Sequence, residues 1–142
     1  MLQNDFFRIK TIDRQEGSCK IVLELNVRHK IFGGHFPGQP VVPGACMVQM
    51  VKELMEWILR QPDLQQKERG GRLRLIRADQ IKFLKVIDPS KDSIAEMSLT
   101  YSVEKGYFSK EGLGETGIGI RVSAGLANGE GTCFKFEGVF RV

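Results

Sequence analysis

Long apolar runs, paired cysteines and cofactor motifs are all missing from this sequence of 142 residues. No run approaches the ~18 consecutive apolar residues that a membrane-spanning helix needs. The first ten residues also lack the basic start, apolar stretch and small-residue cleavage site of a secretory signal. These absences predict a cytoplasmic protein with no membrane span. Because no nucleotide-, flavin- or metal-binding motif occurs, the sequence implies no cofactor.

Cysteine is scarce: the sequence has three, Cys19, Cys46 and Cys133, and none of them forms a CxxC pair. An odd number of distant cysteines favours neither a disulfide framework nor a zinc site. We therefore expect three reduced cysteines that pack in the core.

A strong excess of one charge is missing too. The 21 Lys and Arg residues against 17 Asp and Glu residues give a net charge of +4, which is too mild and too dispersed for a nucleic-acid-binding protein. The densest basic segment runs from Lys67 to Lys85 and includes Arg72, Arg74 and Lys82. Its simplest interpretation is the solvated face of a strand. The alternative is a patch that faces an acidic partner.

The sequence contains enough apolar material for one core. Hydrophobic residues make up 42% of the chain, and no repeat, low-complexity tract or long linker divides it. Residues 1–142 are therefore expected to form a single domain.

Strand-type patterns occur twice in the first part of the chain and four times in the second part. The expected strands are Asp5–Asp13, Ser18–Leu25, Leu73–Val86, Ser93–Val103, Ile118–Leu126 and Thr132–Val142. Asn128-Gly129 favours a type I′ turn between the last two strands. The Gly-rich segment Glu104–Gly117 is predicted to be a long connection.

One long apolar helix is expected between these two sets of strands. Pro43 suits the first turn of a helix, and Pro62 ends it. Residues 45–51 leave almost no polar face, which predicts that the first half of the helix is enclosed on all sides. Lys52, Glu56 and Arg60 mark a solvent-facing side further on. Six strands and one buried helix predict an α+β domain in which a strongly curved antiparallel sheet wraps around the helix.

The segment Asn26–Val42 is crowded with Gly and Pro, which interrupt regular structure, so it is expected to be a shaped loop. With the start of the helix it reads HKIFGGHFPGQPVVPGACMVQMVKE. The part His-Phe-Pro-Gly-x-Pro-x-x-Pro-Gly resembles the signature of the 3-hydroxyacyl-[acyl-carrier-protein] dehydratases. A weaker similarity extends over RADQIKFLKVIDPSKDSIAEMSLTYS. The resemblance implies the hotdog fold, an antiparallel sheet of five to six strands wrapped around one long central helix.

The resemblance also implies a reaction, the dehydration of 3-hydroxyacyl thioesters to trans-2-enoyl thioesters in fatty-acid or related lipid biosynthesis. Such a reaction needs a base near the C2 proton and an acid near the C3 hydroxyl. By the resemblance, His35 is the base, and Gly44 supplies a backbone N–H at the helix start that binds the thioester oxygen. Without its motif, His35 would be interpreted as a structural histidine of a tight loop. His29 has no motif, and we assign it no chemistry.

The acid position departs from the family pattern. In the family a carboxylate, usually Glu, lies fourteen residues after the histidine and a glutamine follows one turn later, whereas here Gln49 and Glu53 are exchanged. Four residues apart, the two side chains share one helix face. Either Glu53 is the acid, or Gln49 merely orients a water or the hydroxyl, or the chain has lost catalysis. A further interpretation makes Glu53 an ordinary solvated charge.

The resemblance implies assembly as well. Two subunits pair their sheets edge to edge, and each site combines the histidine of one chain with the carboxylate of the other beside an apolar tunnel. Candidate tunnel residues are Phe32, Phe36, Val42, Met47 and Phe83.

The implied partners are a second copy of the chain, as a homodimer or a higher oligomer, and an acyl carrier protein carrying a 3-hydroxyacyl chain. Because the carrier is acidic, the basic segment is a candidate docking face. Two other functions remain open, a non-catalytic acyl-binding or scaffolding subunit that pairs with an active dehydratase, and an acyl thioesterase on the same fold.

Overall fold

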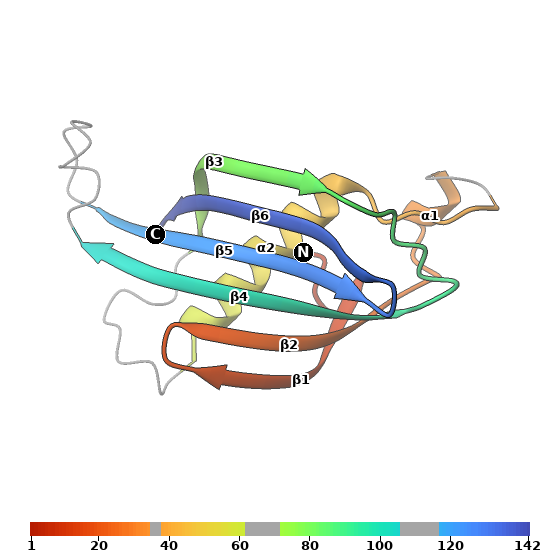
Figure 1. The fold of residues 1–142 in the computed structure, drawn as a ribbon, viewed down its shortest axis with the longest axis horizontal. Coiled ribbons are helices and arrows are strands. Elements are labelled where there is room, and N and C mark those ends of the chain that lie inside the picture. Colours follow the sequence, from red (N-terminus) through yellow and green to blue (C-terminus); the bar gives the residue numbers. More distant parts are fainter. Residues whose placement is uncertain (35–37, 62–71, 106–116) are drawn as a thin grey trace.

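The computed structural model describes residues 1–34, 38–61, 72–105 and 117–142, which form one antiparallel six-stranded sheet and two helices (Figure 1). The strands are β1 (Phe7–Gln15), β2 (Ser18–Leu25), β3 (Arg74–Phe83), β4 (Ile94–Lys105), β5 (Ile118–Asn128) and β6 (Gly131–Arg141). The helices are α1 (Ile31–Gly34) and α2 (Gly44–Leu59). The strand order is β1-β2-β4-β5-β6-β3, so β1 and β3 are the two edges.

The core lies between α2 and the face of the sheet that α2 crosses (Figure 1). The alternation predicted for β5 is confirmed, because Ile120, Val122, Ala124 and Leu126 are all buried. From α2, the side chains that are fully buried include Met50, Leu54, Met55 and Ile58. Burial of each such side chain contributes about 1.5–3 kcal/mol relative to exposure, so this layer is the main source of stability. The architecture is the α+β hotdog arrangement that the resemblance implies.

Both predicted hairpins form, but the second turn differs from the expected one. Asn128 pairs with Gly131, so Gly129 and Glu130 are the central residues, and the positive φ of 111° belongs to Gly131. The prediction of a type I′ turn centred on Asn128-Gly129 is therefore wrong. Tertiary contacts shift the turn, since the Asp92 carboxylate accepts the Gly129 N–H at 3.1 Å.

The enclosure of α2 agrees with the prediction only in part: Cys46, Met47, Met50 and Val51 are buried and Arg60 is exposed, as expected. Ala45 is exposed near its start, whereas Glu53 and Glu56 in the second half are 1% and 5% exposed. Glu56 was expected on a solvent-facing side, and that expectation is wrong. The reason is local: its carboxylate accepts the Leu73 N–H at 2.7 Å, so the charge is buried against a backbone donor.

The loop before α2 contains one regular element that the sequence did not predict, the short helix α1. Residues 35–37, and with them the predicted site residues His35 and Phe36, lie outside the described residues, as do residues 106–116 of the predicted long connection.

Two predictions about composition have clear outcomes. Cys19, Cys46 and Cys133 are free and buried, which confirms their interpretation as reduced core residues. Arg72, Arg74 and Lys82 are exposed on or beside the edge strand β3.

In the described part of the chain, no helix is long and apolar enough to cross a membrane.

Candidate active site

The start of α2 faces an apolar cavity of about 330 Å³. Four of the predicted substrate-binding and tunnel residues line it, namely Val42, Gly44, Met47 and Phe83. Leu84, Lys85 and Val86, which follow β3, form another part of its wall. The structure thus brings together a helix start and an apolar surface, as the predicted tunnel requires.

Gly44 lies directly under the Phe83 ring. A β-carbon at position 44 would lie 2.6 Å from Cζ of Phe83, so the exposed end of that ring would have to move. The Phe83 ring is held there by stacking on Phe134, with 5.5 Å between ring centroids, yet Phe83 remains 57% exposed. The ring therefore lies over the first helical residue and forms part of the cavity wall.

The start of α2 has N–H groups without a side-chain cap from the described part of the chain. Pro43 is the N-cap residue, in an extended conformation with φ −64° and ψ 144°, and no side chain among the described residues caps this end. The first N–H groups of a helix have no intrahelical acceptor, and together with the helix dipole they attract negative charge. An oxygen that gains charge during a reaction is stabilised at such a place.

Phe32 lies elsewhere. Its side chain is buried, with its ring centroid 5.4 Å from that of Phe6, and it does not line the cavity at Gly44. It packs α1 onto the N-terminal residues instead. No signal in the sequence separated it from the other tunnel candidates.

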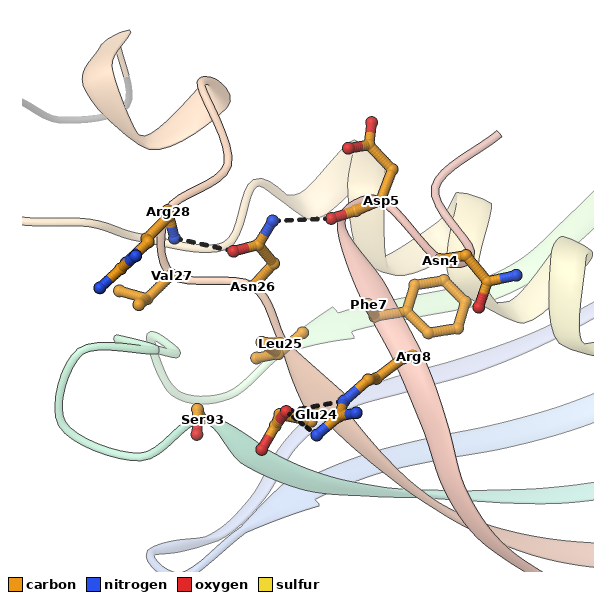
Figure 2. Close-up of a pocket in the computed structure, with 10 residues that line it drawn as sticks. All are labelled: Asn4, Asp5, Phe7, Arg8, Glu24, Leu25, Asn26, Val27, Arg28 and Ser93. Carbon is orange, nitrogen blue, oxygen red and sulfur yellow. Dashed lines mark hydrogen bonds and ion pairs between the residues drawn. The ribbon is translucent and has the colours of Figure 1, made fainter.

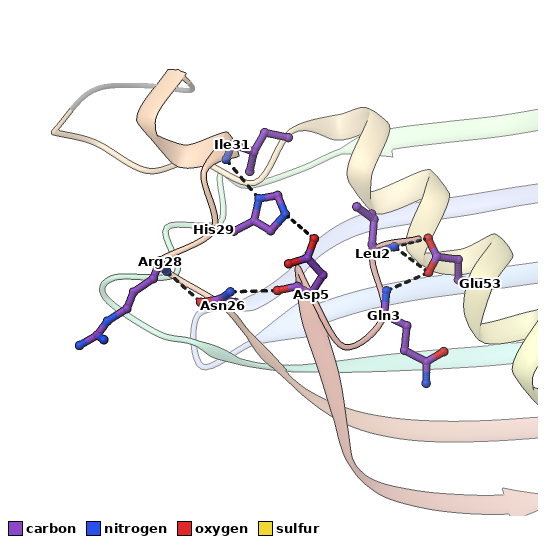
Figure 3. Close-up of polar contacts among 8 residues, drawn as sticks. All are labelled: Leu2, Gln3, Asp5, Asn26, Arg28, His29, Ile31 and Glu53. Atoms are coloured by element: carbon purple, nitrogen blue, oxygen red, sulfur yellow. Dashed lines mark hydrogen bonds and ion pairs between the residues drawn. The ribbon is translucent and has the colours of Figure 1, made fainter.

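Gln49 and Glu53 are hydrogen-bonded to each other, since Gln49 Nε2 donates to Glu53 Oε2 at 2.9 Å. The Glu53 carboxylate also accepts the Leu2 N–H at 2.9 Å on both oxygens and the Gln3 N–H at 2.9 Å on Oε1 (Figure 3). The interpretation of Glu53 as a solvated charge is therefore wrong. All of these contacts come from N–H donors, so the Glu53 carboxylate acts as a hydrogen-bond acceptor in each of them.

His29, to which the sequence gave no role, is bonded on both ring nitrogens. Its Nδ1 accepts the Ile31 N–H at 3.1 Å, so the ring proton is assigned to Nε2, which lies 3.1 Å from Oδ2 of Asp5 (Figure 3). The available signal was its position two residues before α1. His29 thus links the start of α1 to the N-terminal residues.

A second cavity, of about 420 Å³, shares no lining residue with the first (Figure 2). Polar and apolar residues line it together, from the N-terminal turn, the start of β1, the end of β2 with the residues that follow, and Ser93. The ion pair between Arg8 and Glu24, with 2.7 Å between Nη2 and Oε1, lies on its wall. No motif in the sequence pointed to this cavity.

The remaining reactive groups of the described residues are few. No set of three His, Cys, Asp or Glu side chains within them is arranged to hold a metal ion. Burial raises the pKa of the Cys46 thiol above its ordinary 9.0. Because a thiol with a raised pKa stays neutral near pH 7, Cys46 is not an activated nucleophile.

Comparison with protein families places these features in a known context. The ApeI-like family, described as ApeI dehydratase, matches residues 11–115 of the chain.

Two curated relatives carry the same name, 3-hydroxyacyl-[acyl-carrier-protein] dehydratase FabZ. The protein of Caldanaerobacter subterraneus subsp. tengcongensis is 26% identical over 119 residues, which cover 82% of this chain and 81% of the relative. The protein of Methylobacterium sp. (strain 4-46) is 32% identical over 82 residues, which cover 58% of this chain and 49% of the relative.

A solved structure has the same fold. A chain of the dehydratase heterocomplex ApeI:P from Xenorhabdus doucetiae aligns with a TM-score of 0.54 and 15% sequence identity, covering 94% of this chain and 96% of that one. At this identity the likeness concerns the fold alone. It agrees with the hotdog arrangement of the sheet and α2.

Proposed function

This chain belongs to the ApeI-like dehydratase family, and on that premise we propose that it takes part in dehydrating 3-hydroxyacyl thioesters carried on acyl carrier protein to trans-2-enoyl thioesters. The observation that carries the proposal is the uncapped start of α2 at Gly44, which opens beside an apolar cavity directly after the His-Phe-Pro-Gly motif. An acyl thioester needs both features, an apolar surface for its chain and N–H donors for its carbonyl oxygen.

In the proposed reaction, His35 takes the C2 proton of the substrate. The electron pair of that C–H bond forms the C2–C3 double bond, and negative charge that passes through the thioester oxygen is stabilised at the Gly44 N–H and the helix dipole. The C3–O bond breaks, and the hydroxyl leaves as water with a proton from an acid.

The source of that proton decides between two forms of the proposal. Gln49 has no titratable proton, and Glu53 as the acid stays a prediction. The contacts of Glu53 support an anchoring role, because all of them come from N–H groups that hold the N-terminal residues and Gln49. The acid would then come from another subunit.

The edge strand β3 supports assembly with a second hotdog chain. Its exposed apolar side chains, together with those that follow it, are Leu75, Ile76, Ile81, Phe83, Leu84 and Val86. None of the exposed large apolar side chains of the described residues belongs to the opposite edge, β1. We infer that β3 pairs with β3 of a second copy or with the edge of a related subunit.

Each of these two assemblies corresponds to one candidate function, a catalytic homodimer or a supporting subunit in a heterodimer. In a homodimer, both sites hold His35 and the Gln49–Glu53 pair. In a heterodimer, one site combines His35 of this chain with a carboxylate of an active dehydratase, and this chain is the supporting subunit. The exchange of Gln49 and Glu53 favours the heterodimer, and the heterocomplex of the structural neighbour is in line with it.

The exposed basic residues Arg74 and Lys82 on β3, and Arg72 just before it, support docking of an acidic carrier protein. Carrier-bound substrates also fit the cytoplasmic location that the sequence predicts.

The test is a turnover assay on the full chain, alone and together with an active FabZ-type dehydratase. Enoyl product and free thiol are measured with a 3-hydroxyacyl carrier substrate for the parent, His35→Ala and Gln49→Glu. Enoyl formation that is lost in His35→Ala supports the proposal. Enoyl formation by the mixture that exceeds that of the FabZ-type dehydratase alone, and that His35→Ala abolishes, identifies the supporting subunit. Enoyl formation only in Gln49→Glu identifies a chain that has lost catalysis. Free thiol without enoyl identifies a thioesterase and contradicts both forms.

A further inference from the structure

The N-terminal residues Leu2 to Phe6 form a tight turn, which we call the N-terminal bracket. The N–H groups of Asp5 and Phe6 both donate to the Leu2 carbonyl, at 3.1 and 2.6 Å. Asn4 has a positive φ of 69°, which the short polar side chain of asparagine tolerates. The bracket is therefore a defined piece of backbone with fixed ends.

One end of the bracket is attached to α2 through Glu53. The Leu2 and Gln3 N–H groups both donate to its carboxylate at 2.9 Å, and that carboxylate is 1% exposed (Figure 3). A buried carboxylate needs such donors, and the donors need an acceptor, so the two groups hold each other in place.

The other end is attached to the turn that precedes α1. Asp5 Oδ2 lies 3.1 Å from His29 Nε2, and Asn26 Nδ2 donates to the Asp5 carbonyl at 2.9 Å (Figure 3). The fully buried Phe6 ring meets His29 edge-on, at 5.4 Å between centroids and 78° between planes, and it also contacts Phe32 of α1.

His29 connects the N-terminal bracket to α1 through hydrogen bonds. Its Nδ1 accepts the Ile31 N–H and its carbonyl accepts the Phe32 N–H, both at 3.1 Å. These are the first N–H groups of the short helix, which cannot be satisfied inside it. The last residue of α1, Gly34, is followed directly by His35 in the sequence.

We propose that Glu53 is a positioning residue: through the N-terminal bracket and His29 it sets the orientation of α1, from which the chain enters the His-Phe-Pro-Gly motif. Its consequence for catalysis rests on the proposed function, because only a dehydratase needs that motif held at one distance from the start of α2. A misplacement of about 1 Å in an active site costs on the order of 100-fold in rate.

A glutamine at position 53 separates this role from that of an acid. Its Oε1 still accepts the Leu2 and Gln3 N–H groups, and its amide N–H₂ donates to Oε1 of Gln49 once the Gln49 amide has rotated. The anchoring role thus survives Glu53→Gln, whereas a proton-donating role does not. Glu53→Leu keeps the volume but removes every acceptor.

The experiment compares Glu53→Gln, Glu53→Leu and Asp5→Ala in the full chain, with Glu56→Gln as the matched control. Glu56 is also a buried carboxylate of α2, but it binds the Leu73 N–H and does not touch the bracket. Amide exchange of residues 31–34 is measured by mass spectrometry or NMR, and kcat and KM are measured in whichever assembly turns over.

For Glu53→Leu and Asp5→Ala we expect exchange at residues 31–34 to accelerate at least about tenfold and kcat to fall about tenfold or more, with KM within about threefold. Glu53→Gln and Glu56→Gln are expected to leave both quantities within about threefold of the parent.

Two results would overturn the proposal. If Glu53→Gln abolishes turnover as completely as His35→Ala while exchange in α1 is unchanged, Glu53 is the acid. If Asp5→Ala leaves the exchange rate of the α1 amides unchanged, the N-terminal bracket does not hold α1 in place. Asp5 is exposed, so this variant folds even where Glu53→Leu does not. Exchange needs no turnover, so a parent that is inactive in every assembly refutes the proposed function and leaves the positioning role of Glu53 to be decided by exchange.

Discussion

The start and the middle of α2 use backbone hydrogen bonding in opposite ways. At its start the helix presents its own N–H groups to a cavity, with no side-chain cap on Gly44 among the described residues. In its middle, Glu53 and Glu56 accept N–H groups from chain segments that return to the helix, Leu2 and Gln3 in one case and Leu73 in the other. The start of α2 thus has N–H groups without a side-chain cap in the described part of the chain, whereas Glu53 and Glu56 connect the helix to other segments of the chain.

This difference explains why the type of a residue on a helix is a poor guide to its role. Both carboxylates of α2 are buried and bonded to N–H groups, although one was expected in catalysis and the other in solvent. What sets their role is the presence of unpaired backbone donors from elsewhere in the chain.

The largest effect on stability is expected in the middle of α2. In Glu56→Leu the Leu73 N–H loses its acceptor in a buried place, so the free energy of unfolding falls by about 2–3 kcal/mol. Urea unfolding measures it, with Lys52→Gln as the control on the same helix, expected within about 0.5 kcal/mol of the parent. If the free energy of unfolding also changes by less than about 0.5 kcal/mol in Glu56→Leu, the hydrogen bond between Glu56 and the Leu73 N–H does not stabilise the fold.

The start of α2 is expected to be sensitive to volume. In Gly44→Ala the new methyl group collides with the Phe83 ring, which lowers the free energy of unfolding by about 1–3 kcal/mol and narrows the cavity. The double variant Gly44→Ala/Phe83→Leu removes the colliding ring atoms and recovers part of the loss, as thermal unfolding will show. If it recovers nothing, the collision is not the reason for glycine at position 44.

A smaller effect is expected where the two regions meet, at the Gln49–Glu53 pair. Gln49→Glu brings a second carboxylate to the oxygen that now accepts an N–H at 2.9 Å. Repulsion between like charges lowers the free energy of unfolding at pH 7 by about 1 kcal/mol, measured in urea. Gln49→Met, which has a similar shape and no charge, is the control, and a larger loss in Gln49→Met than in Gln49→Glu would contradict this account.

The smallest effect concerns pH. Burial raises the pKa of the Cys46 thiol above 9.0, so on raising the pH the unfolded chain loses this proton first. The folded state then binds more protons than the unfolded state, and stability falls as pH rises past about 9. Cys46→Ala is expected to show a shallower fall between pH 8 and pH 10, with Cys133→Ala as a comparison. Identical slopes in the parent and Cys46→Ala would mean that the pKa of the Cys46 thiol is the same in the folded and the unfolded chain.

Much of the fold could be predicted from the sequence, because alternating strands such as β5 and a helix bounded by prolines are local patterns. The cavity residues Val42, Gly44 and Met47 could be predicted through their motif. The roles of Glu53, Glu56 and His29 could not, since each depends on a backbone N–H brought from a distant segment or on an unpredicted short helix. The turn at Gly129 was missed for the same kind of reason, a contact with Asp92.

The apolar edge of β3 has a consequence for how the cell must make this protein. An unpaired edge strand with exposed apolar side chains can pair with an extended segment of another chain. A newly synthesised chain whose β3 edge is not yet covered is therefore prone to aggregate. If this chain forms the proposed heterodimer, its production alone is expected to yield inclusion bodies, and its production together with the second subunit a clear lysate.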